Sequence, residues 1–167
     1  EVLGTPPVEA VVYAARFGRD KCRTPMQWAN APNAGFSPPG VQTWLPVNPS
    51  YAQGVNVADE LAGPDSLLNF YRRLLRVRKH NPALIAGEYI PLHEDTQDYL
   101  AFLRHSVDDG QTCLVLLNMS NRAHVLSFDL PATTMRVIFS SHSRGSTTDE
   151  LMHLPIAPFE VYIAEVT

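Results

Sequence analysis

The second half of this sequence predicts an antiparallel β-sandwich, and a long loop and one helix precede it. Three observations carry this prediction. Short segments of alternating apolar and polar residues follow one another from about residue 87 onward, at a spacing of roughly ten residues, and turn-forming residues separate them. Residues 66–80 have the apolar spacing of a helix. The first 64 residues contain most of the prolines and glycines. The chain is therefore expected to be mainly β.

Size and composition restrict the function further. The chain has 167 residues, which suits one domain or one domain plus a fragment, and 45% of them are hydrophobic. The formal net charge of -4 gives no basic excess, so nucleic acid is not an expected partner. The longest apolar run, Cys113 to Leu117, is far too short to cross a membrane, so no membrane partner is expected. Because the sequence begins at Glu1 without a leader, we expect a fragment or a processed product.

The two cysteines, Cys22 and Cys113, form neither a disulfide framework nor a metal motif. Two reduced thiols are the simplest interpretation. They fit a cytoplasmic protein, which is the location we expect.

Residues 1–64 are expected to be connected loops with short extended pieces. A loop of that length is uncommon in a self-contained compact domain and is more natural across a larger scaffold. Within it, the string RTPMQWANAPNAGF at residues 23–36 has neither a helical period nor a strand alternation.

The helix at 66–80 has Asp65 as its expected N-cap, and Pro82 ends it. Its apolar stripe consists of Leu67, Phe70, Tyr71, Leu74, Leu75 and Val77. Five cations occupy the remaining positions, and a solvated face explains them better than a phosphate site because no Gly-rich loop accompanies them: Arg72, Arg73, Arg76, Arg78 and Lys79.

Seven short strands are expected, which favours a small antiparallel sandwich. In the second of them, the inward set is either Tyr99, Ala101 and Leu103 or Leu100 and Phe102. The seven segments are Glu88–Leu92, Tyr99–His105, Thr112–Asn118, His124–Phe128, Met135–Ser140, Glu150–Leu154 and Phe159–Val166.

No catalytic machinery is recognisable in the chain. A glycosidase needs two carboxylates facing each other, but the adjacent pair Asp59 and Glu60 points apart. The turn acids, among them Asp98 and Asp149, are expected to be solvated surface groups. The six histidines lack zinc-binding spacing, so no metal or cofactor is expected. The segment Asn118-Met119-Ser120 matches the N-glycosylation sequon, which matters only in a secretory pathway.

Five strings resemble the α-amylase superfamily, and they are most similar to its α-glucosidase, oligo-1,6-glucosidase and trehalose-synthase branch. This resemblance implies that residues 1–85 are what remains of a (β/α)8 barrel: the loop after strand 8 and then helix 8, at about 66–80. It implies that residues 86–167 are the C-terminal antiparallel β-domain, which LPIAPFEVYIAEV at 154–166 closes. The five strings are GRDKCRTPMQW (18–28), NAGF (33–36), WLPVNPSY (44–51), VNV (55–57) and SLLNFYRRLLRVRKHNPAL (66–84).

The resemblance also implies a role for Arg23, whose family counterpart helps to hold the terminal glucose in the first donor subsite. Trp28 is either a sugar-stacking platform or a buried anchor of the loop, and Met26 and Gln27 are expected to pack the loop. Ala29 stands where many relatives have aspartate. The family's catalytic carboxylates come from earlier barrel strands whose motifs do not occur here, so no catalytic residue is expected in this chain.

The resemblance therefore implies the C-terminal part of a retaining α-glucosidase that acts on α-linked glucosides and is not catalytic by itself. The implied partners are an α-glucoside in the intact parent and the missing barrel portion; calcium use by the parent is left open. Exposed apolar surface predicts a homodimer or poor order in residues 1–60. Two alternatives are kept: a non-catalytic structural or carbohydrate-binding β-module, and part of a transporter-associated relative without activity.

Overall fold

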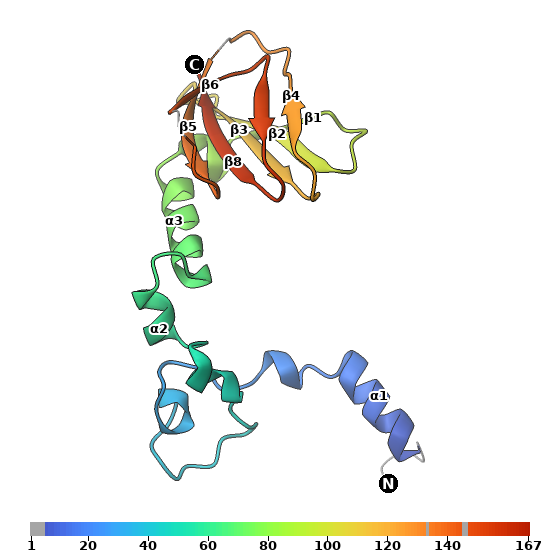
Figure 1. Ribbon diagram of the computed structural model, residues 1–167, viewed down its shortest axis with the longest axis vertical. Coiled ribbons are helices and arrows are strands. Elements are labelled where there is room, and N and C mark those ends of the chain that lie inside the picture. Colours follow the sequence, from blue (N-terminus) through green and yellow to red (C-terminus); the bar gives the residue numbers. More distant parts are fainter. Residues whose placement is uncertain (1–5, 133, 145–146) are drawn as a thin grey trace. The chain divides into compact units, whose positions relative to one another are not determined.

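The computed structural model describes residues 6–132, 134–144 and 147–167 (Figure 1). The chain divides into two compact units, Glu1–Tyr71 and Arg72–Thr167. The division falls within one helix, and each unit is described by itself below.

In the described part of the first unit, short helical turns alternate with irregular backbone, and no strand is present. Extended backbone occurs between the turns, for example at Ala31 and Asn56, in agreement with the expected short extended pieces. Helix α1, however, replaces an expected loop. Proline fits the first position of a helix, where its missing N–H costs nothing, and helix-forming residues follow Pro7. The elements are α1 (Pro7–Phe17), η1 (Asp20–Cys22), η2 (Pro32–Gly35), η3 (Pro49–Gln53) and α2 (Val57–Ala62).

Helix α3 (Leu67–Lys79) confirms the helix expected at 66–80. Its N-cap differs from the expectation. The Ser66 hydroxyl, not Asp65, accepts a hydrogen bond from the Asn69 backbone N–H at 3.2 Å. The Glu60 carboxylate accepts from the Leu68 N–H at 3.0 Å. These two acceptors satisfy N–H groups that the first turn leaves unpaired, so Asp65 is not needed as a cap.

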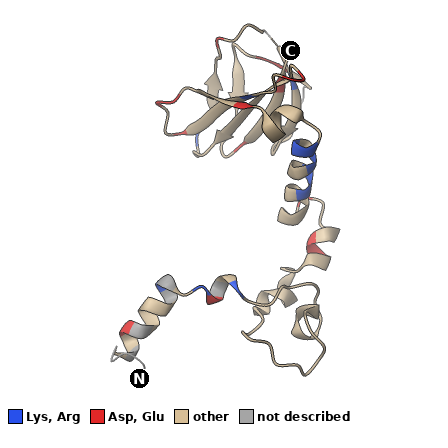
Figure 2. Cartoon of the chain, turned by 180° about the vertical axis from the view of Figure 1, so that it is seen from behind, with Lys and Arg blue, Asp and Glu red and all other residues tan. Residues whose placement is uncertain are grey.

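Neither face of α3 is buried. All five of its cations are exposed, in agreement with a solvated face, and Figure 2 shows them along the helix. No residue of α3 is buried. Leu67, Tyr71 and Leu75 of the apolar stripe are exposed as well. Phe70, Leu74 and Val77 are half-buried, so within the described residues the stripe is only partly covered.

The second unit continues with α4 (Pro82–Ala86) and eight strands. Six strands form one sheet in the order β1-β2-β3-β8-β5-β6, and β4 pairs with β7 in a second sheet. All these pairings are antiparallel, which confirms the antiparallel prediction. The strands are β1 (Glu88–Leu92), β2 (Tyr99–His105), β3 (Thr112–Asn118), β4 (His124–Leu126), β5 (Thr134–Ser140), β6 (Thr148–Glu150), β7 (Leu154–Ile156) and β8 (Val161–Val166).

The first three strands have the predicted bounds, but later ones differ. The predicted strand Glu150–Leu154 is instead the end of β6, a turn, and the start of β7. The last strand begins at Val161 and not at Phe159, because Phe159 has a φ of 56°, in the left-handed region. A residue in that conformation cannot continue a strand.

Both sheets contribute to one hydrophobic core. Ala101 and Leu103 are buried whereas Leu100 is 38% exposed, so the first of the two predicted inward sets is correct. Burial of such a leucine side chain stabilises the fold by about 1.5–3 kcal/mol. The core consists of Ala101, Leu103, Leu114, Leu116, Met135, Tyr162 and Ala164 from the larger sheet, Leu126, Leu154 and Ile156 from the smaller one, and Phe128 and Leu151 from the segments that follow β4 and β6.

Candidate functional site

Arg23 lies directly after η1, in the string that resembles a sugar-binding loop. Its backbone N–H donates to the Asp20 carbonyl at 3.0 Å. Its own carbonyl accepts from the Trp44 indole Nε1–H at 2.7 Å. The Arg23 side chain is exposed, which leaves its guanidinium donors accessible to a ligand.

Gln27 connects this string to a later part of the loop. Its side-chain amide donates to Ser50 Oγ at 3.1 Å and to the Val55 carbonyl at 2.5 Å. Its backbone carbonyl accepts from the Val57 N–H at 2.9 Å. Pro25 is buried two residues before it. The expected role of Gln27 in packing the loop agrees with these contacts.

Trp28 is not a buried anchor, because half of the residue is exposed. Its backbone does the anchoring instead. The Trp28 N–H donates to the Ala34 carbonyl at 2.9 Å, and the Trp28 carbonyl accepts from the Ala58 N–H at 3.0 Å. Main-chain bonds in both directions therefore fix this position without burying the indole ring.

The string ends in a turn of three left-handed residues. Asn33, Ala34 and Gly35 have φ values of 51°, 53° and 69°. The Ala34 side chain is fully buried, and its carbonyl accepts from two backbone N–H groups. Asn33 tolerates this conformation well, and its side-chain amide donates to Ser37 Oγ and to the carbonyls of Pro38 and Val41. Hydrogen bonds to the Ala34 carbonyl and from the Asn33 side chain therefore stabilise this turn.

Phe36 follows the turn and meets Trp44 edge to face. The ring centroids are 5.2 Å apart and the ring planes meet at 81°. Trp44 is 65% exposed, and its one indole N–H points to Arg23. The sequence contains no signal for the bond between Trp44 and Arg23, because the two residues are 21 positions apart in an irregular segment.

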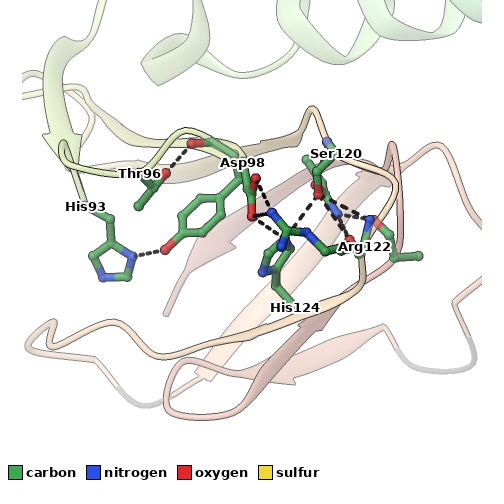
Figure 3. A network of polar contacts seen from close by, with 9 residues as sticks. His93, Thr96, Asp98, Ser120, Arg122 and His124 are labelled. Carbon is green, nitrogen blue, oxygen red and sulfur yellow. Dashed lines mark hydrogen bonds and ion pairs between the residues drawn. The ribbon is translucent and has the colours of Figure 1, made fainter.

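A second polar cluster lies in the β-domain, between the loops at the ends of β2 and β3 (Figure 3). Arg122 donates to both carboxylate oxygens of Asp98, at 2.8 and 2.6 Å. His124 Nε2 lies 3.2 Å from Ser120 Oγ and 3.6 Å from Asp98 Oδ2. A catalytic triad needs the serine and the aspartate on different ring nitrogens. Because both groups meet the same nitrogen here, the cluster joins loops and does not activate the serine.

Asn118, the residue of the glycosylation sequon, belongs to the same region. It is 4% exposed. Its side-chain amide donates to the carbonyls of Arg122 and Ala157 at 2.7 and 2.8 Å. Its side-chain oxygen accepts from the backbone N–H and the hydroxyl of Ser120. Both amide hydrogens are used, so a glycan on this nitrogen is incompatible with the fold.

The most buried ion pairs join Arg144, in the segment between β5 and β6, to Asp149 in β6 and to Glu160, directly before β8. Arg144 donates to Glu160 Oε1 at 2.8 Å, to Asp149 Oδ2 at 2.9 Å and to the Pro155 carbonyl at 2.8 Å. Its guanidinium also lies 4.1 Å from the centre of the Tyr162 ring. The sequence predicts solvated acids at Asp98 and Asp149, but both are paired with arginine. Ion pairs between distant turns have no local sequence signature.

Glu160 and Tyr162 are among the groups whose pKa values these contacts shift. Burial raises the pKa of Glu160, but hydrogen bonds from Arg144, Ala157 and Ser140 outweigh burial and hold the pKa below its ordinary value. Burial, and then the hydrogen bond to Asp149, raise the pKa of Tyr162. Glu160 is therefore an ionised, fully paired acid and not a proton donor for catalysis.

Other chemistry is limited in the part of the chain that is described. No group of three or more histidine, cysteine, aspartate or glutamate side chains is arranged there to hold a metal ion. No helix there is long and apolar enough to cross a membrane. Both cysteines are free thiols, and burial raises the pKa of the Cys113 thiol to about 11.

Comparison with known proteins identifies the class to which the loop and helix belong. Residues 6–87 match the family model described as alpha amylase, catalytic domain. The whole chain also has a match among solved structures. The trehalulose synthase MutB of Pseudomonas mesoacidophila MX-45 is 31% identical, with a TM-score of 0.79 over 98% of this chain and 28% of that one. Another MutB structure, an E254Q mutant in complex with the substrate sucrose, has a TM-score of 0.80 and 30% identity over the same shares.

A curated relative is similar over nearly the whole chain. The glucan 1,6-alpha-glucosidase of Streptococcus pneumoniae serotype 4 is 40% identical over 96% of this chain and 28% of its own length. The chain therefore belongs to the α-amylase superfamily, and it spans a little over a quarter of the length of these relatives.

Proposed function

We propose that this chain is the C-terminal part of a retaining α-glucosidase that acts on α-linked glucosides and that the chain is not catalytic by itself. The observation that carries the proposal is Arg23, an exposed arginine in a loop whose backbone is fixed on both sides. It lies within the residues that match the alpha-amylase catalytic domain.

The proposal assigns a place to each part of the chain. Residues 1–85 are the loop after the eighth strand of a (β/α)8 barrel and the eighth helix, and residues 86–167 are the C-terminal β-domain. The exposed residues Leu67, Tyr71 and Leu75 of the apolar stripe of α3 support the first assignment, because a barrel helix packs that face on barrel strands. Loops at this end of a barrel build the active site, which is where Arg23 would meet the sugar.

The chemistry requires residues beyond this chain. A retaining glycosidase uses one carboxylate as nucleophile and a second as acid and base. In the β-domain, Glu160 and Asp149 are held in ion pairs with Arg144. In the loop unit, Asp59 and Glu60 cap or connect helices. These acids have structural roles, so the catalytic pair is assigned to the rest of the enzyme.

The role of Arg23 follows from the geometry of its side chain. A guanidinium has five N–H donors in a fixed plane, so it can bind sugar hydroxyls and a carboxylate together. Lysine has the same charge but offers donors from a single point. Each hydrogen bond from the charged guanidinium should contribute roughly 1.5–3 kcal/mol to the free energy of sugar binding.

A kinetic experiment on the full-length enzyme that carries this chain tests the proposal. With 4-nitrophenyl α-glucoside as substrate, Arg23→Ala is expected to lower kcat/KM by about 10- to 100-fold, and Arg23→Lys should recover only part of that loss. The matched control is Arg76→Ala, which removes an exposed guanidinium from α3. An Arg23→Ala enzyme within twofold of wild type would disprove the role of Arg23. Turnover of the same substrate by the 167-residue chain alone would disprove the assignment of the catalytic residues.

We also infer a cytoplasmic location. Two free thiols are typical of a reducing compartment.

A further inference from the structure

The backbone on both sides of Arg23 is held by a separate hydrogen bond. On the N-terminal side, its N–H donates to Asp20 within the turn of η1. On the C-terminal side, its carbonyl accepts from Trp44. The first bond is local and forms wherever the turn forms. The second joins two distant parts of the loop, so it decides the orientation of the peptide between Arg23 and Thr24.

Trp44 is itself held in place by the left-handed turn. The turn at 33–35 directs Phe36, and the edge of one ring meets the face of the other at 5.2 Å between centroids. Edge-to-face pairs of this kind are stabilised by the charge distribution of the two rings. The turn therefore orients Phe36, the Phe36 ring packs against Trp44, and the Trp44 indole N–H bonds to Arg23.

Two polar side chains beside Trp44 form hydrogen bonds within the loop. A depression there is lined by Asn33, Thr43, Trp44 and Tyr51, among others. The Asn33 amide is used for three bonds inside the loop, and the Thr43 hydroxyl donates to the Leu45 carbonyl at 2.6 Å. These two groups are therefore bonded within the loop, and the indole N–H of Trp44 is bonded to the Arg23 carbonyl.

We propose that Trp44 is a positioning residue for Arg23: its indole N–H fixes the peptide from which the sugar-binding guanidinium projects. This inference rests on the proposed function and adds a residue that acts through Arg23 without touching the sugar. A single neutral hydrogen bond contributes about 0.5–1.5 kcal/mol. Its loss should therefore weaken substrate binding by about 3- to 10-fold.

The experiment removes the indole N–H and asks whether the effect requires Arg23. Trp44→Phe in the full-length enzyme is expected to raise KM for 4-nitrophenyl α-glucoside about 3- to 10-fold and to change kcat by less than twofold. In an Arg23→Ala background, Trp44→Phe should add almost nothing, because the group that it positions is gone. Val41→Ala is the matched control, since Val41 is an exposed side chain of the same segment.

Replacement by unnatural amino acids separates the hydrogen bond from packing. Benzothienylalanine at position 44 keeps the shape of the double ring but has no N–H, and it should behave like Trp44→Phe. 5-Fluorotryptophan keeps the N–H and should behave like wild type. If both analogues are equally active, the N–H has no role and the inference is overturned.

The remaining outcomes distinguish this inference from the proposed function. If Arg23→Ala has no effect, the proposed function fails and the inference fails with it. If Arg23→Ala lowers activity but Trp44→Phe does not, the function stands and the inference is overturned. If the two effects multiply in the double variant, Trp44 acts independently of Arg23, which also overturns the inference.

Discussion

The two units of this chain are stabilised in different ways. The β-domain has a continuous core from two sheets and buried ion pairs around Arg144. In the described part of the loop unit, the buried residues are Pro25, Ala34 and Asn56. That unit is held by main-chain hydrogen bonds, side-chain amides and a left-handed turn. The comparison indicates that the β-domain has a hydrophobic core of its own, whereas the loop unit leaves many apolar side chains exposed.

The largest difference between the units should appear when an apolar side chain is shortened. Leu116→Ala leaves a cavity in the core of the β-domain and should lower the free energy of unfolding by about 3–5 kcal/mol. Val11→Ala in the exposed helix α1 should change it by less than about 0.5 kcal/mol. Urea unfolding followed by circular dichroism measures both. Equal losses would show that the units do not differ in this way.

Breaking the Arg144 network should have the next largest effect. Arg144→Met leaves the buried Glu160 carboxylate without its charged partner and should cost about 3 kcal/mol at pH 7. Because the pKa of Glu160 is lowered in the folded state, its stabilising contribution is present above the ordinary glutamate pKa and is lost as pH falls through the folded value. The wild type should thus lose stability below about pH 4.5, and Arg144→Met should show less of this loss. Urea midpoints between about pH 3 and pH 7 test it; identical pH profiles would contradict the role of Glu160.

A smaller decrease in the free energy of unfolding is expected when Asn118 is replaced. Asn118→Ala removes donors from the carbonyls of Arg122 and Ala157 and should cost about 2 kcal/mol, because buried carbonyls lose their partners. The matched control is Asn121, an exposed asparagine in the loop that follows β3. Asn121→Ala should be nearly neutral in the same thermal unfolding assay. A neutral Asn118→Ala would show that the junction is not needed.

The smallest expected effect tests the loop unit itself. Ala34→Val places a β-branched residue at a φ of 53° in a buried position and should cost about 1–2 kcal/mol. Its effect should be local, because the amides of Trp28 and Ala29 both donate to the Ala34 carbonyl. Hydrogen exchange at these two amides should accelerate while exchange in β3 stays unchanged. Acceleration in both places would mean that the two units unfold together.

The sequence predicted most of the local structure of the β-domain. Strands β1, β2 and β3 have the predicted bounds because alternation and turn residues are local signals. The turn between β6 and β7 was missed because Leu151 and Leu154 are both apolar and buried, so the pattern is continuous through it. The order of strands in the sheet depends on pairing between distant segments, which no local pattern encodes.

The candidate site was less predictable than the fold. Arg23 was found only through the resemblance of its surrounding string to a family, since nothing about one exposed arginine in a loop indicates sugar. The contact from Trp44 depends on how the loop folds back over 21 residues. The left-handed conformation of Ala34 was also not predictable, because alanine does not favour it and the residue is fully buried here.

The position of β8 has a consequence for folding. This strand is the last of the eight to leave the ribosome, yet it lies in the middle of the larger sheet, between β3 and β5 (Figure 1). Until Val161–Val166 has been made, β3 has β2 on one side and an open edge on the other, and β5 is separated from β3. Open strand edges are sites of aggregation. A released chain in which β8 has not yet paired would therefore expose the strand edges of two half-sheets, and aggregation should be greatest at that stage of folding.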